Sequence, residues 1–65
     1  SGKDRDALRV LGLEVDADRM ALRRRYSELV RKYHPDRNGG DRSHEDALRR
    51  TIEAYQQLKG SAAFA

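Results

Sequence analysis

The chain has 65 residues, a formal net charge of +3 and no cysteine. A domain of this size buries only about 60% of the surface that its unfolded chain exposes, which makes an enclosed active site hard to build. Without cysteine, the chain has neither disulfides nor thiolate metal ligands. Charged residues make up 38% of the chain, and no apolar run approaches the roughly 18 residues of a membrane span. These properties favour a small soluble binding module.

Glycine and proline divide the chain into three segments with the apolar spacing of helices, and none shows the alternation of a strand. The turn residues are Gly12, Pro35, Gly39, Gly40 and Gly60. The first helix is predicted over about 4–11, with Asp4 or Asp6 as its N-cap and Gly12 directly after its end. Its apolar face consists of Ala7, Leu8 and Leu11.

The second helix is predicted over about 17–33. Asp16 is a suitable N-cap, and Asp18 in the first turn complements the positive end of the helix dipole. One apolar stripe consists of Leu22, Tyr26, Leu29, Val30 and Tyr33. Because proline disfavours helical geometry in the residue before it, the helix is expected to end at His34.

The third helix is predicted to start at Ser43, with Asp46 in a capping pattern, and to stop at Gly60. Its apolar stripe consists of Leu48, Thr51 or Ile52, Tyr55 and Leu58, with Ala47 and Ala54 as small contacts. The chain is therefore expected to be all-α, an antiparallel hairpin of the second and third helices with the short first helix across it. We interpret residues 1–2 as a cloning remnant, 3–60 as the domain and 61–65 as a tail whose Phe64 packs on the hairpin.

The loop after the second helix contains His34-Pro35-Asp36. It fails the calcium-loop pattern, because the sixth and twelfth positions counted from Asp36 hold Asp41 and Ala47 rather than Gly and Glu. Pro35 keeps the chain extended, so His34 and Asp36 are poorly placed as an acid–base pair, and no nucleophile motif accompanies them. From the residues alone, the tripeptide is either ordinary helix punctuation or a rigid, exposed contact element.

The function of a basic face on the second helix is equally open. Arg23, Arg24, Ser27 and Arg31 share it, on the side away from the apolar stripe. Such a face can simply be solvated, can guide an acidic protein partner, or can neutralise nucleic-acid phosphates.

Four short motifs occur in order over roughly residues 5–59. They are Val10-Leu11-Gly12-Leu13, Leu22-x-x-x-Tyr26-x-x-Leu29, Lys32-Tyr33-His34-Pro35-Asp36-Arg37-Asn38 and Glu53-Ala54-Tyr55-x-x-Leu58. In order and spacing they resemble the J-domain of DnaJ-type co-chaperones. The resemblance implies a domain that docks on a DnaK-type heat-shock protein 70 chaperone and stimulates its ATP hydrolysis.

The resemblance also implies roles for single residues. Asp36 is expected to pair with a chaperone arginine, Pro35 to set the loop geometry and His34 to orient the loop. The other implied contact residues are Arg23, Tyr26 and Arg31 on the second helix, and Arg37 and Asn38 in the loop. We accordingly expect a cytoplasmic, monomeric partner-binding domain that is not an enzyme and holds no cofactor or metal.

The chain also departs from the family pattern. Ser27 replaces a usual basic residue, Leu48 a usual phenylalanine, and residues 60–65 lack the charged character of a fourth helix, which is expected to be short or absent. These departures leave open a J-like interaction scaffold that stimulates no ATPase. A basic nucleic-acid-binding domain is the other alternative, although no base-reading Asn or Gln lies on the arginine face.

Overall fold

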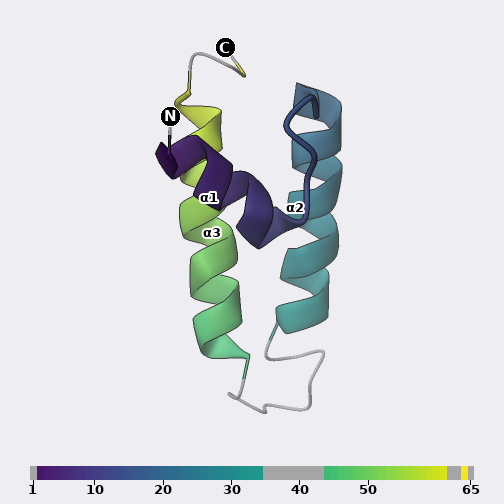
Figure 1. Cartoon of the computed structure of the whole chain (residues 1–65). Helices are drawn as coiled ribbons and strands as arrows, with labels where there is room; N and C mark the ends of the chain where they lie inside the picture. Colours follow the sequence, from purple (N-terminus) through teal and green to yellow (C-terminus); the bar gives the residue numbers. More distant parts are fainter. Residues whose placement is uncertain (1, 35–43, 62–63, 65) are drawn as a thin grey trace.

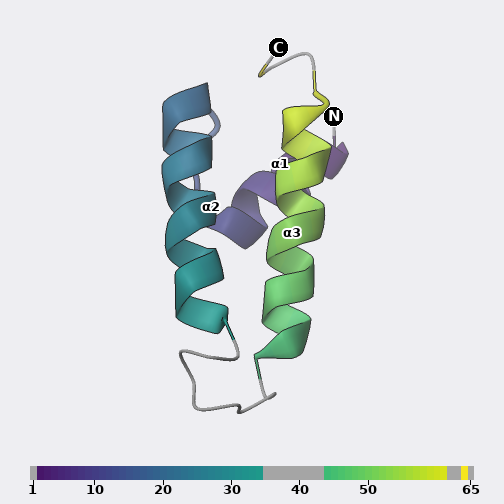
Figure 2. The ribbon, with the colours of Figure 1, turned by 180° about the vertical axis from the view of Figure 1, so that it is seen from behind.

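The computed structural model describes residues 2–34, 44–61 and 64 of the chain. These residues form three helices, α1 (Gly2–Leu11), α2 (Arg19–Tyr33) and α3 (Glu45–Lys59). Helices α2 and α3 lie side by side, and α1 crosses them on one face (Figure 1) and is seen behind them in the reverse view (Figure 2). The predicted all-α hairpin with a first helix across it is thereby confirmed. Within the described residues α3 is the last helix, and most of the tail lies outside them.

The core lies where the three helices meet. It consists of Ala7, Leu8, Leu11, Leu22, Leu29, Ala54, Leu58 and Phe64, with Thr51 as a buried polar member. Leu11 and Leu58 are fully buried, and Leu13, Tyr33 and Tyr55 pack against the cluster while remaining partly exposed. Each predicted stripe therefore contributes residues to the core, although Tyr26, Val30 and Leu48 are only half-buried and are not among its members. At the position left open between Thr51 and Ile52, it is Thr51 that is buried.

Thr51 is accommodated in this core because its hydroxyl has a partner. Its Oγ1 donates a hydrogen bond of 2.8 Å to the carbonyl oxygen of Ala47, one turn earlier on α3. A buried hydroxyl without such a partner costs free energy, whereas this one is satisfied within its own helix.

The C-terminal end of α1 is closed by a glycine motif. The backbone N–H of Gly12 donates to the carbonyl of Arg9 at 3.1 Å, and that of Leu13 donates to the carbonyl of Leu8 at 2.8 Å. Together with the positive φ of 72° at Gly12, these two bonds form a Schellman motif. The prediction of Gly12 as the residue after the first helix is confirmed, and the motif turns the chain toward α2.

The start of α2 was predicted two residues too early. Its N-cap is Asp18, not Asp16, because the Asp18 carboxylate accepts a hydrogen bond of 2.8 Å from the backbone N–H of Ala21. Asp18 has extended backbone angles, whereas the N–H of Ala17 is used in a turn to the carbonyl of Glu14. Both aspartates are good capping residues, so the choice depends on where the preceding turn ends.

The starts of the other two helices also differ from prediction. Helix α1 begins at Gly2, so neither Asp4, in its first turn, nor Asp6 is the N-cap that was predicted. Helix α3 begins at Glu45 with His44 as its N-cap and no side-chain capping bond, so the predicted start at Ser43 is wrong by a residue or two. Ser43 itself lies outside the described residues. At the other end, Gly60 follows α3 as predicted, and its N–H donates to the carbonyl of Gln56 at 3.2 Å.

Two long-range contacts hold the ends of the chain on the hairpin. The Asp4 carboxylate accepts hydrogen bonds from Gln57 Nε2 at 3.0 Å and from Ser61 Oγ at 2.6 Å. The carbonyl of Phe64 accepts bonds from Arg19 Nη2 at 2.8 Å and Nε at 3.2 Å, and the Phe64 side chain is buried as expected. The two contacts attach α1 to the end of α3, and the tail to the start of α2.

The Asp4 contact predicts a pH-dependent contribution to stability. The hydrogen bond from Gln57, followed by that from Ser61, lowers the pKa of the Asp4 carboxyl below its ordinary value. A lowered folded-state pKa stabilises the fold above the unfolded-state pKa, and this stabilisation disappears as the pH falls through the folded-state pKa. Asp4→Asn is therefore expected to lower the melting temperature at neutral pH, with a difference from the unaltered chain that shrinks as the pH falls below about 4. Thermal melts at several pH values measure it, and a pH-independent difference would contradict the proposed titration.

In the described part of the chain, none of the helices is both long and apolar enough to cross a membrane.

Candidate functional site

The three predicted contact residues of α2 occupy an outward side of the helix. Arg23 and Arg31 are exposed, and Tyr26 between them is half-buried. The Nε of Arg31 donates a long hydrogen bond of 3.4 Å to the backbone carbonyl of Ser27, which leaves its guanidinium at the surface. Arg24 is exposed as well, so the basic face inferred from the helical spacing is present on the folded domain.

Tyr26 links this face to α3. Its ring stacks on that of Tyr55, with centroids 4.0 Å apart and planes 13° from parallel. Because one tyrosine comes from α2 and the other from α3, the pair fixes the distance between the helices on the side where Arg23 and Arg31 are exposed. Tyr26 thus has a packing role in addition to any role at a surface.

Arg25 has a structural role that the sequence pattern did not indicate. Its Nε donates a hydrogen bond of 2.7 Å to the carbonyl of Leu11, one of the carbonyls left without a partner at the end of α1. Its Nη1 lies 3.9 Å from the carboxylate of Glu28. Arg25 therefore ties α2 to α1 and does not belong to the exposed basic face. Residues 11 and 25 are far apart in the sequence, so no local pattern could have indicated this contact.

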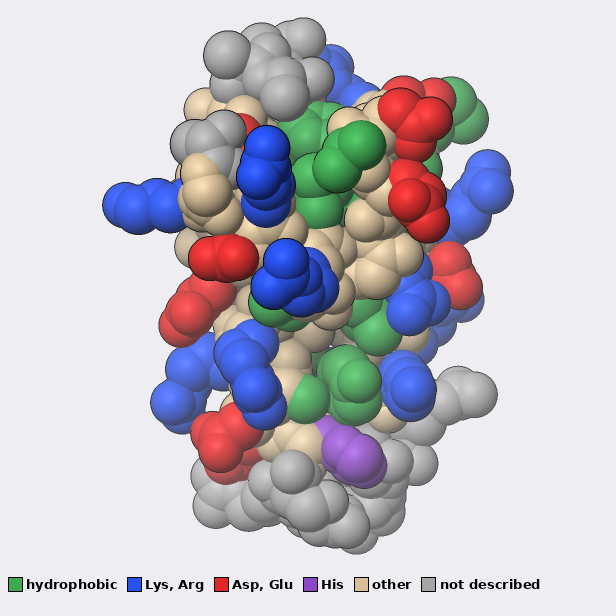
Figure 3. All heavy atoms as spheres, in the orientation of Figure 1, with side chains coloured by type: hydrophobic (Ala, Val, Ile, Leu, Met, Phe, Trp, Pro, Cys, Tyr) green, Lys and Arg blue, Asp and Glu red, His purple; other side chains and the backbone are tan. Residues whose placement is uncertain are grey.

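Basic and acidic side chains are interspersed on the face of the molecule that carries α1 (Figure 3). On α3, Arg49 lies 4.0 Å from Asp46. Exposed pairs of this kind contribute little to stability, but they cancel much of the local charge. In the described part of the chain, no three His, Asp or Glu side chains are grouped so that they could hold a metal ion.

The end of α2 presents His34. This residue is exposed and has φ −65° and ψ 133°, the extended geometry expected before a proline. On the preceding turn, the Lys32 ammonium lies 5.5 Å from the centroid of the Tyr33 ring. The other tripeptide residues, Pro35 and Asp36, lie outside the described residues, as do Arg37 and Asn38.

A contact between Tyr33 and His44 joins the two ends of the loop. Their rings lie 5.4 Å apart at an angle of 33°, and Tyr33 also packs against the core. The last residue of α2 is thereby held next to the N-cap of α3, so His34 projects from a fixed base. The contact of His44 depends on the pairing of the two helices, which local spacing does not reveal.

The comparison with known protein families gives one decisive match. The family model of the DnaJ domain matches residues 6–63, which is nearly the whole chain. The chain is a J-domain. The resemblance inferred from its four motifs is therefore confirmed, and the J-domain family is a family of co-chaperones rather than of enzymes.

Curated relatives of this J-domain are longer proteins. It is 47% identical over 53 residues to a Sinorhizobium protein named as an uncharacterized 19.0 kDa protein in the cobS 5′ region, a match that covers 82% of this chain and 31% of that protein. It is 44% identical over 54 residues to the chaperone protein DnaJ of Lachnospira eligens, covering 83% of this chain and 14% of that protein. The J-domain thus spans less than a third of either relative. No solved structure matches it significantly.

Proposed function

We propose that this J-domain docks on a DnaK-type heat-shock protein 70 chaperone and stimulates ATP hydrolysis by that chaperone. The observation that carries the proposal is the placement, in a J-domain, of exposed Arg23 and Arg31 on the helix whose end presents exposed His34. A basic surface and the start of the His-Pro-Asp loop are thus parts of one rigid element. A partner that binds the two arginines is therefore also brought next to the loop.

In this proposal the loop delivers the signal and the basic face guides docking. Asp36 pairs with an arginine of the chaperone, Pro35 sets the loop geometry and His34 orients it. Arg37 and Asn38 support the loop. The assignments of the loop residues rest on the family resemblance, and the geometry around Tyr33 and His44 supports them because it holds both ends of the loop together.

The basic face of α2 suits a short-lived complex. Exposed charges act mainly on the rate of encounter and on orientation, and they add little affinity. Arg23 and Arg31 therefore steer an acidic surface of the chaperone toward the loop, and Tyr26 adds contact area between them. The domain itself performs no chemistry, and it needs no metal, cofactor or nucleic acid. We place it in the cytoplasm as a monomer.

The test is the ATPase rate of a DnaK-type chaperone with this chain and with its Asp36→Asn variant. Loss of one partner of a close charge pair at an interface costs about 2–5 kcal/mol. Stimulation by Asp36→Asn is therefore expected to fall at least about tenfold. Single-turnover ATP hydrolysis at a fixed chaperone concentration measures it.

The matched control is Asp6→Asn, the same chemical change at an exposed position of α1. This variant is expected to stimulate as well as the unaltered chain. Equal stimulation by Asp36→Asn and Asp6→Asn would contradict the role of Asp36. Binding to the chaperone without any stimulation would instead favour the interaction scaffold.

A further inference from the structure

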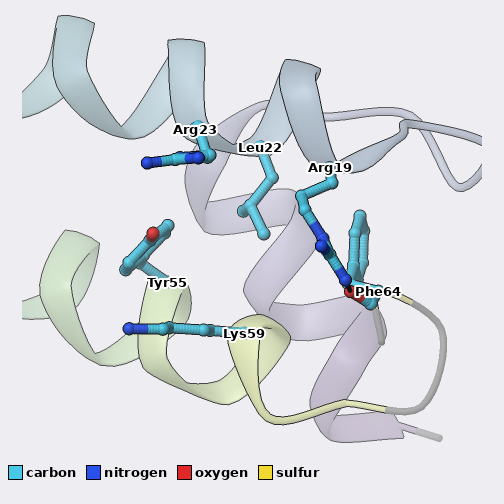
Figure 4. Close-up of a pocket in the computed structure, with 6 residues that line it drawn as sticks. All are labelled: Arg19, Leu22, Arg23, Tyr55, Lys59 and Phe64. Carbon is cyan, nitrogen blue, oxygen red and sulfur yellow. Dashed lines mark hydrogen bonds between the residues drawn. The ribbon is translucent and has the colours of Figure 1, made fainter.

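A pocket lies between α2 and α3, and α1 lies behind it in Figure 4. Its volume is about 410 Å³, within the usual range of roughly 300–1,000 Å³ for ligand pockets. Its lining residues are Arg19, Leu22, Arg23, Tyr55, Lys59 and Phe64. They belong to the first turns of α2, the last turns of α3 and the tail, whereas His34 is at the opposite end of α2.

The lining combines an apolar surface with positive charge. Leu22 and Phe64 are buried members of the core, and the Tyr55 ring is half-buried beside them. Figure 4 shows the side chains of Arg23 and Lys59 pointing the same way, one from each helix, with Tyr55 between them. Among the described residues, the lining contains three cations and no acidic side chain.

Two of the three cations are not neutralised by the described part of the protein. The Arg19 guanidinium is engaged with the carbonyl of Phe64. The Lys59 ammonium lies 6.0 Å from the centroid of the Tyr55 ring, a contact that leaves its charge unbalanced. The Arg23 side chain has neither a hydrogen bond nor an ion pair with any described residue. This differs from Arg25 and Arg49, each of which lies near a carboxylate.

We propose that this pocket binds an acidic peptide segment that carries one large apolar side chain. The apolar side chain packs against Leu22, Tyr55 and Phe64, and carboxylates beside it in the peptide pair with Arg23 and Lys59. Burial of the apolar side chain supplies most of the favourable free energy, while exposed ion pairs add less and provide orientation. The pocket shares Arg23 with the basic face of the proposed chaperone contact, whereas Lys59, Leu22 and Phe64 have no part in that contact and the pocket lies at the end of α2 opposite His34.

The lining fits a peptide better than a nucleic-acid backbone. Duplex DNA carries one negative charge per roughly 1.7 Å of helix axis and is bound by continuous basic surfaces. Here the two available cations flank a pocket whose lining is partly apolar, and that arrangement matches an apolar residue with acidic neighbours. The Glu28 carboxylate on α2 further interrupts the basic surface.

The experiment uses a fluorescein-labelled peptide of sequence Glu-Asp-Leu-Asp-Glu and measures its fluorescence anisotropy as the chain is added. Binding is expected at chain concentrations up to about 1 mM, equivalent to at least about 4 kcal/mol. The same peptide with Ser in place of Leu is expected to bind at least about fivefold more weakly, because it lacks the group that fills the pocket. This comparison leaves the protein unaltered, so it does not depend on the folding of a variant.

The protein variants locate the site. Lys59→Glu is expected to weaken binding of the leucine peptide at least about fivefold, because it replaces an attraction by a repulsion. Lys3→Glu, the same change at an exposed position of α1, is expected to leave binding unchanged. Circular dichroism confirms that each variant is folded. Lys59→Gln replaces Lys59→Glu if a negative charge at the end of α3 unfolds the domain.

Several results would overturn the proposal. They are the absence of binding, equal binding of the leucine and serine peptides, and equal loss of binding in Lys59→Glu and Lys3→Glu. A single-stranded DNA oligonucleotide that binds more tightly than the leucine peptide, with the same dependence on Lys59, would show a nucleic-acid site instead.

Discussion

Leu58→Ala is expected to lower the free energy of unfolding by about 2–5 kcal/mol, the range for a buried leucine replaced by alanine. Leu58 is fully buried, in a core that contains only a few large side chains. A domain of this length has a total stability of roughly 3–10 kcal/mol, so the loss is expected to unfold a measurable fraction at room temperature. Urea denaturation followed by circular dichroism measures it.

Met20→Ala is the control for this change, because it also replaces a large apolar side chain on a helix by alanine. Met20 is 70% exposed, on the first turn of α2. Its replacement is expected to change the free energy of unfolding by less than about 0.5 kcal/mol, as at most surface positions. Similar losses in both variants would show that Leu58 is not at the centre of the core.

The helices and their buried faces could be predicted because they depend on local spacing. Leu22 and Leu29 fall on one side of α2 as soon as the chain is wound as a helix, and both are buried. The same holds for Ala54 and Leu58 on α3. Proline geometry likewise placed the end of α2 at His34. These features need no knowledge of how the helices pack together.

The capping residues and the contacts between distant parts of the chain could not be predicted, because they depend on how the helices pack together. Asp16 and Asp18 are equivalent as caps, and only the path of the preceding turn selects Asp18. The contact of Asp4 with Gln57 joins positions 53 residues apart, and that of Arg19 with Phe64 joins positions 45 apart. Each exists because α1 or the tail packs on the hairpin, which no spacing within one helix specifies.

Some features of the candidate site could likewise be predicted from the sequence, and others could not. The exposure of Arg23 and Arg31 followed from the helical wheel. The bond from Arg25 to the carbonyl of Leu11 did not, because it depends on where α1 ends in space. The pocket around Tyr55 was not anticipated either, since its lining comes from two helices and the tail. The roles of Pro35 and Asp36 remain predictions from the motif.

Gly12→Ala is expected to lower the free energy of unfolding by about 1–2 kcal/mol, because Gly12 has a positive φ of 72° that a residue with a Cβ adopts only at that cost. The cost comes from the backbone and not from crowding. An added Cβ would lie 3.4 Å from Arg25 Nη2, which is an ordinary contact with the end of a flexible side chain. Urea denaturation of the variant measures the loss.

Gly60→Ala provides the matched comparison, because both glycines directly follow a helix. Gly60 has φ −89°, and among the described residues an added Cβ would meet only the carbonyl of Gln56, at 3.6 Å. Alanine fits this conformation and restricts the unfolded chain, so Gly60→Ala is expected to be neutral or to stabilise by up to about 1 kcal/mol. The two substitutions therefore have opposite expected signs at equivalent positions. Equal destabilisation by both would mean that the Schellman motif at Gly12 contributes nothing beyond helix termination, and that the left-handed turn between α1 and α2 is not required for the fold.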